Sequence, residues 1–145
     1  MARVDASGTL LAPRADVWAL LAEPNHLPDW WAGYRAVRPD RRGLAEGARW
    51  TIVRSLDAGL GLFRKPESEG LIVLKTVEPQ RLLVWHDLQQ GFDARIELGD
   101  APDGLTAVRV TVDAPWLRLR SEGLRNLPES AVTRLHDLCQ TALAL

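Results

Sequence analysis

The sequence predicts an α+β fold in which a curved antiparallel sheet of about six to seven strands wraps around a long C-terminal helix. Apolar and polar residues alternate with a period of two from residue 34 to residue 113, and short turn segments interrupt this alternation. Residues 128–143 instead repeat their apolar side chains at helical spacing. Two short helices are expected after the first strand. The 145 residues, 46% of them hydrophobic, fit a single domain over residues 1–145.

The N-terminal segment is expected to form a half-buried strand over Arg3–Leu11, where apolar and polar residues alternate. Pro13 then opens a helix at its first turn, where the missing N–H of proline is harmless, and this helix continues to about Glu23. Pro24 ends it and starts a second, irregular helical segment that stops at Gly33. This order places a helix pair between the first strand and the rest of the sheet.

The central part of the chain is expected to be a meander of hairpins, because the connections between its strands are short. Residues 57–67 are unusual, since Gly59 and Gly61 stand among apolar residues that include Phe63. This segment is expected to be an apolar loop that closes over a cavity, or a plain hairpin tip or glycine-bent strand edge. The expected strands are Tyr34–Arg38, Ala48–Leu56, Ser68–Val77, Arg81–Leu88, Phe92–Leu98 and Thr106–Asp113.

The C-terminal helix begins near Pro128, with Glu129 at the positive end of its dipole. A broad apolar stripe along this helix needs a large apolar partner, and the inner face of the sheet is the one available. The stripe consists of Val132, Leu135, Leu138, Cys139, Ala142 and Leu143. The inner sheet face is expected to carry Trp50, Ile52, Val84, Ile96, Val108 and Val110.

Composition and motifs exclude several classes of function. A net charge of −1 gives no global attraction to nucleic acid or to an anionic membrane, and no run approaches the roughly 20 apolar residues of a membrane span. The N-terminal residues do not resemble a signal peptide, so the expected location is cytoplasmic. A single cysteine, Cys139, excludes an internal disulfide and a cysteine-based metal cluster. No metal-ligand or phosphate-loop motif is present, so neither a metal nor a cofactor is expected.

Two polar residues are candidates for chemistry inside an apolar cavity. If Val84 faces inward, the period of two places His86 on the same side, where a neutral imidazole can act as general acid or base. The alternatives are a structural histidine, or the opposite register with Leu83 and Trp85 inside. Arg54 shares a face with Trp50, and a buried guanidinium there would need a carboxylate from the protein or from a ligand. The alternative for Arg54 is an exposed position near a strand end.

Six tryptophans in a small domain suit a core that is partly a cavity. Adjacent Trp30 and Trp31 face different ways, so one is expected to pack into the core and the other to line the pocket mouth. Packing of both rings into the core is the alternative.

Several segments carry a resemblance to a known family. The matching stretches are "LAPRADVWALLAEPNHLPDWWAG" (Leu11–Gly33), "EGARW" (Glu46–Trp50), "VEPQRLLVW" (Val77–Trp85) and "GLTAVRVTV" (Gly104–Val112). With the order of the elements, they resemble the START-related helix-grip superfamily, and within it the polyketide cyclase/dehydrase-like proteins akin to the birch pollen allergen. The segment 114–130 departs from that pattern, with three arginines and a tryptophan before the helix.

The resemblance implies a deep apolar pocket between the sheet and the C-terminal helix. Members of the family bind lipids, sterols, polyketides or plant hormones, and some catalyse cyclisation or dehydration. The expected function is therefore binding of a small hydrophobic ligand such as a lipid, polyketide, aromatic or isoprenoid-like molecule. The alternatives are a cyclase or dehydratase, with His86 as its catalytic residue, and a chaperone-activator-like interaction domain. Expected ligand-binding residues are Trp30, Trp31, Trp50, Arg54, Phe63, Val84, His86, Ile96 and Cys139.

The expected partner is thus a small hydrophobic molecule, with no nucleic acid and no stable membrane insertion. The sequence leaves open whether the chain is a monomer or a homodimer.

Overall fold

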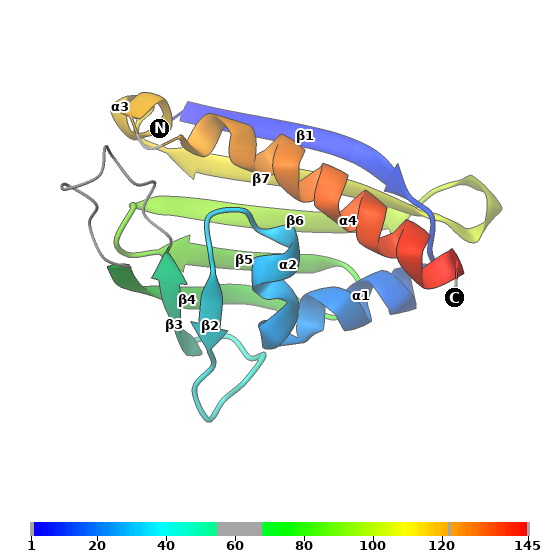
Figure 1. The fold of residues 1–145 in the computed structure, drawn as a ribbon, viewed down its shortest axis with the longest axis horizontal. Helices are drawn as coiled ribbons and strands as arrows, with labels where there is room; N and C mark the ends of the chain where they lie inside the picture. The colour runs from blue at the N-terminus through cyan, green and yellow to red at the C-terminus, as the bar shows by residue number, and fades with distance from the viewer. Residues whose placement is uncertain (1, 55–67, 122, 145) are drawn as a thin grey trace.

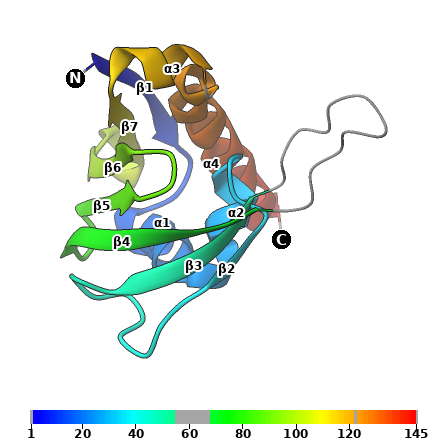
Figure 2. The ribbon, with the colours of Figure 1, turned by 90° about the vertical axis from the view of Figure 1, so that its left-hand side faces the viewer.

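The computed structural model describes residues 2–54, 68–121 and 123–144. The strands form one antiparallel sheet in the order β1-β7-β6-β5-β4-β3-β2, with the helices on one of its faces (Figures 1 and 2). Successive strands from β2 to β7 are neighbours, and β1 pairs with β7. The strands are β1 (Ala2–Leu10), β2 (Ala36–Arg38), β3 (Arg49–Arg54), β4 (Ser68–Glu78), β5 (Leu82–Asp87), β6 (Phe92–Asp100) and β7 (Thr106–Ala114). The predicted α+β fold class is confirmed.

The helices also follow the predicted order. Pro13 precedes α1, and the side chain of Glu23 accepts a hydrogen bond from the backbone N–H of Asn25, which caps the short 3-10 helix that follows. An additional helix, α3, occupies part of the segment where the sequence departs from the family pattern. The helical elements are α1 (Arg14–Ala22), η1 (Pro24–His26), α2 (Leu27–Trp30), η3 (Pro102–Gly104), α3 (Trp116–Ser121), η4 (Leu124–Asn126) and α4 (Leu127–Ala144).

One strand boundary near the predicted site differs from the sequence expectation. Strand β2 begins at Ala36 and not at Tyr34, because the backbone N–H of Tyr34 donates to the carbonyl of Trp31 and so belongs to the turn after α2. The predicted apolar loop, with Phe63 as its site residue, lies outside the described residues.

The sheet curves around α4, which packs mainly against β1 and β7 (Figure 1). The pairing of β4 with β5 shifts register between Leu74 and Thr76, an irregularity of the kind that bends a strand. On β1, Gly8 allows the close approach of α4, since a Cβ added there would lie only 2.8 Å from Cγ1 of Val132. The absence of a side chain at this position therefore sets how deeply the helix sits in the sheet.

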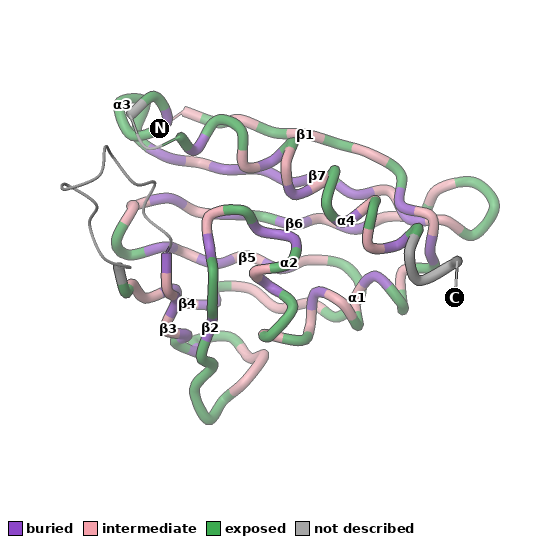
Figure 3. The backbone as a smooth tube through the Cα atoms, viewed as in Figure 1, coloured by how far each residue is buried: buried purple, intermediate pink, exposed green. Residues whose placement is uncertain are grey.

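Aromatic rings from α2 and the turn after it fill the other half of the sheet interior. The ring centroid of Trp31 lies 4.9 Å from that of Trp85 and 6.2 Å from that of Phe92, and the ring of Trp30 lies 5.9 Å from that of Trp85. The two contacts with Trp85 are edge-to-face and the contact with Phe92 is stacked, and both geometries are favourable beyond the area they bury. Both Trp30 and Trp31 are thus fully buried core residues. Figure 3 shows buried positions recurring along the strands and in the helices.

The register of β5 corrects one sequence prediction. Leu83, Trp85 and Asp87 point into the core, so Val84 and His86 lie on the outer face of the sheet. This register buries the largest side chain of the strand, Trp85, against the tryptophans of the α2 region. The prediction that Val84 and His86 line the interior is therefore wrong, and the opposite register is the one adopted.

Candidate functional site

A pocket of about 450 Å³ lies where α1, η1 and α2 meet the C-terminal half of α4, and we call it the helix pocket. Its volume falls within the range of about 300–1,000 Å³ that is typical of small-molecule sites. Its inner wall is mostly apolar, and three of its residues are titratable side chains of the helix pair. The lining residues are Ala12, Asp16, Ala19, Leu20, His26, Asp29, Leu138 and Cys139.

The spacing of residues along α1 creates one wall of the helix pocket. Val17 and Leu21, four residues apart, turn into the protein core. Asp16, Ala19 and Leu20 occupy the neighbouring face of the same helix and line the pocket. Helix α1 therefore has two apolar faces, and α4 supplies the wall opposite its second face.

The polar groups of the helix pocket are concentrated on the helix pair. Nδ1 of His26 lies 3.0 Å from Oδ2 of Asp29, one turn further along the chain, and both side chains are about half exposed. Asp16 is exposed on α1. The site thus combines an apolar wall with two carboxylates and an imidazole that remain in contact with solvent.

Cys139 contributes a thiol to the pocket wall. Burial raises the pKa of this thiol, and the negative charge of Asp16 raises it further. The thiol therefore stays protonated at neutral pH and acts as a small apolar surface, not as a nucleophile.

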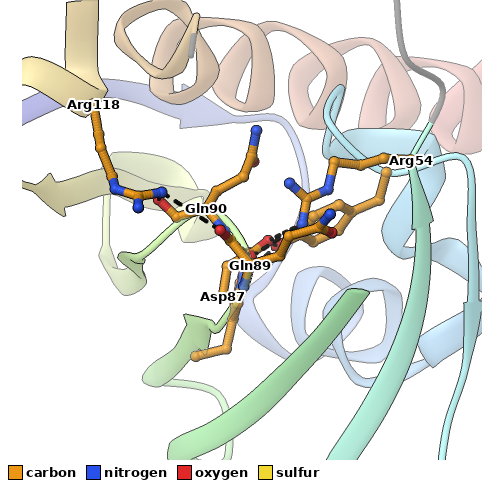
Figure 4. A network of polar contacts seen from close by, with 7 residues as sticks. Arg54, Asp87, Gln89, Gln90 and Arg118 are labelled. Atoms are coloured by element: carbon orange, nitrogen blue, oxygen red, sulfur yellow. Dashed lines mark hydrogen bonds and ion pairs between the residues drawn. The ribbon is translucent and has the colours of Figure 1, made fainter. Parts of the chain in front are cut away.

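The interior of the sheet holds a second polar arrangement, at the end where β3 and β5 meet the turn after α2 (Figure 4). Nη2 of Arg54 lies 3.1 Å from each carboxylate oxygen of Asp87, and the hydroxyl of Tyr34 donates to Oδ2 of Asp87 at 2.8 Å. Nε1 of Trp85 donates to the Tyr34 hydroxyl at 3.1 Å. The buried guanidinium finds its carboxylate within the protein.

Three buried N–H groups near this network have no acceptor among the described residues: Nε1 of Trp30, Nε1 of Trp31 and Nε of Arg54. Buried donors are usually hydrogen bonded, since a lost partner costs about 1–3 kcal/mol.

The structure separates the residues that the sequence grouped into one site. Cys139 lines the helix pocket, whereas Trp30, Trp31, Trp50 and Ile96 are buried in the core and Arg54 is paired with Asp87. On the outer face, Nδ1 of His86 lies 2.7 Å from Oδ1 of Asp93. Because this carboxylate is the cross-strand partner of His86, the imidazole has a structural role there and no access to the interior.

Several residues of both sites were not found from the sequence. Asp87 follows Trp85 with the period of two and would have been placed inside had the opposite register been chosen. Asp16 and Leu20 lie in the predicted first helix, whose local pattern indicates an apolar face but does not show which element covers it. The approach of α1 and α4 to the two sides of the pocket is a tertiary arrangement and has no local sequence signature.

No group of three or more histidine, cysteine, aspartate or glutamate side chains that could hold a metal ion occurs in the part of the chain that the structure describes. Among the helices of that part, none has the length and apolar character needed to cross a bilayer.

The architecture defines the class of protein. An antiparallel sheet that curves around a long C-terminal helix, with a helix pair after the first strand, is a helix-grip-like fold. The sequence matches no protein-family model and no curated protein.

Solved structures with low sequence identity share this fold. Protein NE0264 from Nitrosomonas europaea aligns with 99% of this chain and 97% of its own, with a TM-score of 0.74 and 20% identity. XoxI from Bacillus cereus aligns with 98% of this chain and 95% of its own (TM-score 0.69, 15% identity). The Aha1 dimer from Colwellia psychrerythraea aligns with 95% of this chain and 93% of its own (TM-score 0.63, 15% identity). At these identities the likeness concerns the fold alone.

Proposed function

We propose that this chain binds a small, largely apolar molecule in the helix pocket and acts as a carrier or sequestering protein. The ligand classes that suit the pocket are a lipid, a polyketide and an aromatic or isoprenoid-like molecule. The observation that carries the proposal is a cavity of about 450 Å³ whose lining combines alanine, leucine and cysteine side chains, contributed mostly by α1 and α4, with Asp16, His26 and Asp29. Burial of apolar ligand surface there is favourable by about 25 cal/mol per Å².

We further propose that the chain is a member of the START-related helix-grip superfamily. The residue stretches described above and the helix-grip-like fold support this assignment, and both point to ligand binding as the general activity. A cyclase or dehydratase activity is less well supported, because its candidate acid–base residue, His86, lies on the outer face of the sheet and is paired with Asp93.

The proposal is tested by titration with N-phenyl-1-naphthylamine, a neutral apolar probe whose fluorescence rises in an apolar site. We expect saturable binding to the wild-type chain. The Ala19→Phe variant places a large ring in the helix pocket and should lose binding at least tenfold. Ala15→Phe is the matched control, because Ala15 is an exposed alanine of the same helix that does not line the pocket.

Two outcomes would contradict the proposal. A wild-type chain that binds neither this probe nor a fatty acid or sterol probe has no apolar ligand site of the proposed kind. Equal affinity of wild type and Ala19→Phe, with Ala19→Phe folded by circular dichroism, would place the site elsewhere in the molecule.

A further inference from the structure

The large exposed hydrophobic side chains of the described residues gather at one end of the molecule. They are Trp116 and Leu117 in α3, which are 57% and 71% exposed, and Leu88 after β5, which is 51% exposed. Helix α3 contacts the turn that contains Leu88, because Nη1 of Arg118 donates to the backbone carbonyls of Gln89 and Gln90 (Figure 4). Single exposed apolar residues are common in proteins, whereas a cluster of them marks an interaction surface.

The exposed apolar side chains of α3 are held in place by the rest of the helix. Leu119, in the same short helix, is buried in the core and anchors it. The hydrogen bonds of Arg118 fix the same helix to the β5–β6 turn. Trp116 and Leu117 are therefore presented to solvent by a fixed segment, although burying their side chains would be favourable by about 1.5–3 kcal/mol each.

Arginines surround these apolar residues. Arg120 lies over the ring of Trp116, with its guanidinium carbon 4.9 Å from the ring centroid, and Arg125 lines the same grooves beside β1 as Arg120. Within the described residues, no carboxylate lies within ion-pair distance of Arg118, Arg120 or Arg125. The nearby carboxylates Asp5 and Asp113 are paired with Arg109 and Arg3. We call the five residues Trp116, Leu117, Arg118, Arg120 and Arg125 the basic end.

We propose that the basic end docks the protein on the surface of an anionic phospholipid bilayer. Trp116 and Leu117 enter the boundary between headgroups and acyl chains, and the guanidinium groups of Arg118, Arg120 and Arg125 contact lipid phosphates. The basic end combines aromatic and aliphatic side chains with arginines that have no carboxylate partner among the described residues. This combination matches a membrane surface, which is apolar beneath and negatively charged above. The attachment is peripheral and reversible, since only two or three side chains enter the bilayer.

The composition of the basic end favours a bilayer over a nucleic acid. Arginines on a phosphate backbone account for affinity to both partners. The exposed aliphatic side chains of Leu117, in the basic end, and of Leu88, in the turn that Arg118 contacts, have no favourable contact on a sugar–phosphate backbone, whereas they are stabilised in a bilayer interface. The chain also carries a net charge of −1, so its positive charge is local to this end and not spread along a nucleic-acid groove.

The basic end is remote from the helix pocket. Helix α4 begins just after η4 at the basic end, and the pocket residue Cys139 lies twelve positions further along it, or about 18 Å. Docking therefore leaves the helix pocket open to solvent. Bilayer docking and ligand binding can be tested separately, because a variant can lose one of them and keep the other. A protein that binds an apolar ligand and docks on a bilayer can exchange that ligand with the membrane.

The test is co-sedimentation with vesicles of phosphatidylcholine alone or of equimolar phosphatidylcholine and phosphatidylglycerol. We expect binding to the anionic vesicles, weakened by added salt, and little binding to phosphatidylcholine alone. An arginine near an anionic surface strengthens binding about fivefold, so Arg120→Gln/Arg125→Gln should bind on the order of 25-fold more weakly. Arg41→Gln/Arg42→Gln is the matched control, since it removes the same charge from exposed residues in the β2–β3 connection, far from α3 in Figures 1 and 2.

The position of Trp116 is tested separately. Brominated phosphatidylcholine in the anionic vesicles should quench part of the tryptophan fluorescence, and Trp116→Phe should remove this quenching while most of the binding remains. Trp116 is suited to this readout because it is the exposed tryptophan of the six.

Three results would overturn the proposal. The first is that the wild-type chain sediments with neither type of vesicle. The second is that the two double variants lose binding equally, which would indicate a general effect of charge. The third is binding of single-stranded RNA in preference to the anionic vesicles, which would make a nucleic acid the occupant of the basic end.

Discussion

Arg54 and Asp87 form an ion pair inside the protein, in which the side chain of Arg54 is 7% exposed and that of Asp87 is fully buried. The two residues are not equivalent. Asp87 also accepts hydrogen bonds from the Tyr34 hydroxyl and from the backbone N–H groups of Gln89 and Gln90. Its carboxylate is thus held by four groups, whereas Nε of Arg54 has no acceptor in the part of the chain that the structure describes.

This asymmetry predicts that Asp87→Asn destabilises the fold more than Arg54→Gln does. Loss of the carboxylate leaves a guanidinium buried without its counter-ion, a change that costs about 3–5 kcal/mol. Loss of the guanidinium leaves a carboxylate with three hydrogen-bond donors, so the free energy of unfolding should fall by a smaller amount. Urea unfolding of both variants measures the difference.

The control for this experiment is Glu69→Gln, which breaks the exposed pair between Glu69 and Arg38. Exposed pairs contribute about 0–1 kcal/mol, so this variant should be close to wild type. If Asp87→Asn were as mild as Glu69→Gln, the interior pair would not stabilise the fold as argued.

The same residues show which parts of the fold can be predicted from the sequence and which cannot. Alternation in residues 34–113 and the apolar stripe of the C-terminal helix predicted the sheet and α4, because both patterns are local. The register of β5 was not determined in this way, since its two faces carry similar numbers of apolar residues and Asp87 looks unsuitable for a core. Burial of that carboxylate becomes favourable through contacts that the strand pattern does not show, above all the ion pair with Arg54, on a strand two positions away in the sheet, and the hydrogen bond from Tyr34.

The helix pocket was less predictable than the sheet. It depends on α1 and the C-terminal half of α4, far apart in sequence, lining the same cavity, and Cys139 is the predicted residue that lies there. The expectation of a cavity lined by Trp30 and Trp31 did not allow for the short α2 segment, which brings both rings onto Trp85.

Tyr34 should make the fold sensitive to alkaline pH. Burial raises the pKa of Tyr34 well above its ordinary value of 10.0, and the charge of Asp87 raises it further. Below pH 10 both the folded and the unfolded chain keep the phenol proton, so Tyr34 makes its full contribution to the free energy of unfolding. Above pH 10 the unfolded chain loses this proton and the folded chain keeps it, so the free energy of unfolding falls by up to about 1.4 kcal/mol per pH unit.

Tyr34→Phe should remove this component of the pH dependence. The variant loses the hydrogen bond to Asp87 and the acceptor for Trp85, at a cost of about 1–3 kcal/mol near neutral pH. Its deficit relative to wild type should shrink as the pH rises above 10. Because Tyr34 is the single tyrosine, phenolate absorbance of the folded protein gives a direct check, and ionisation in the folded state at the ordinary pKa would contradict the prediction.

Gly8 should be intolerant of a side chain. In Gly8→Ala the new Cβ would approach Cγ1 of Val132 to 2.8 Å, and a β-branched residue in a helix cannot easily change rotamer. We expect a destabilisation of about 1–3 kcal/mol, the usual cost of overpacking. In the Val132→Ala background the same substitution should cost less, which thermal unfolding of the four proteins of a double-mutant cycle would show. Additive effects would mean that Gly8 does not set the packing distance of α4.

The thiol of Cys139 should report on occupancy of the helix pocket. Because the pKa of the thiol is raised by burial and by the charge of Asp16, alkylation by iodoacetamide should be slow at neutral pH, with the midpoint of its pH–rate profile above 9.0. The Asp16→Asn variant removes the nearby charge and should react about two- to threefold faster, the effect of a partly screened unit charge. Asp29→Asn, also in the pocket wall, should leave the rate unchanged.

Ligand binding should protect the same thiol. N-phenyl-1-naphthylamine in the helix pocket would cover Cys139 and slow its alkylation in proportion to the fraction of sites occupied, and Ala19→Phe should abolish this protection. If the thiol reacted only after a conformational opening that the probe does not affect, the alkylation rate would be the same with and without the probe. A rate that is independent of probe concentration, while the probe still binds elsewhere on the protein, would therefore show that Cys139 does not line the ligand site. Protection that follows the binding curve would place the apolar ligand against α4.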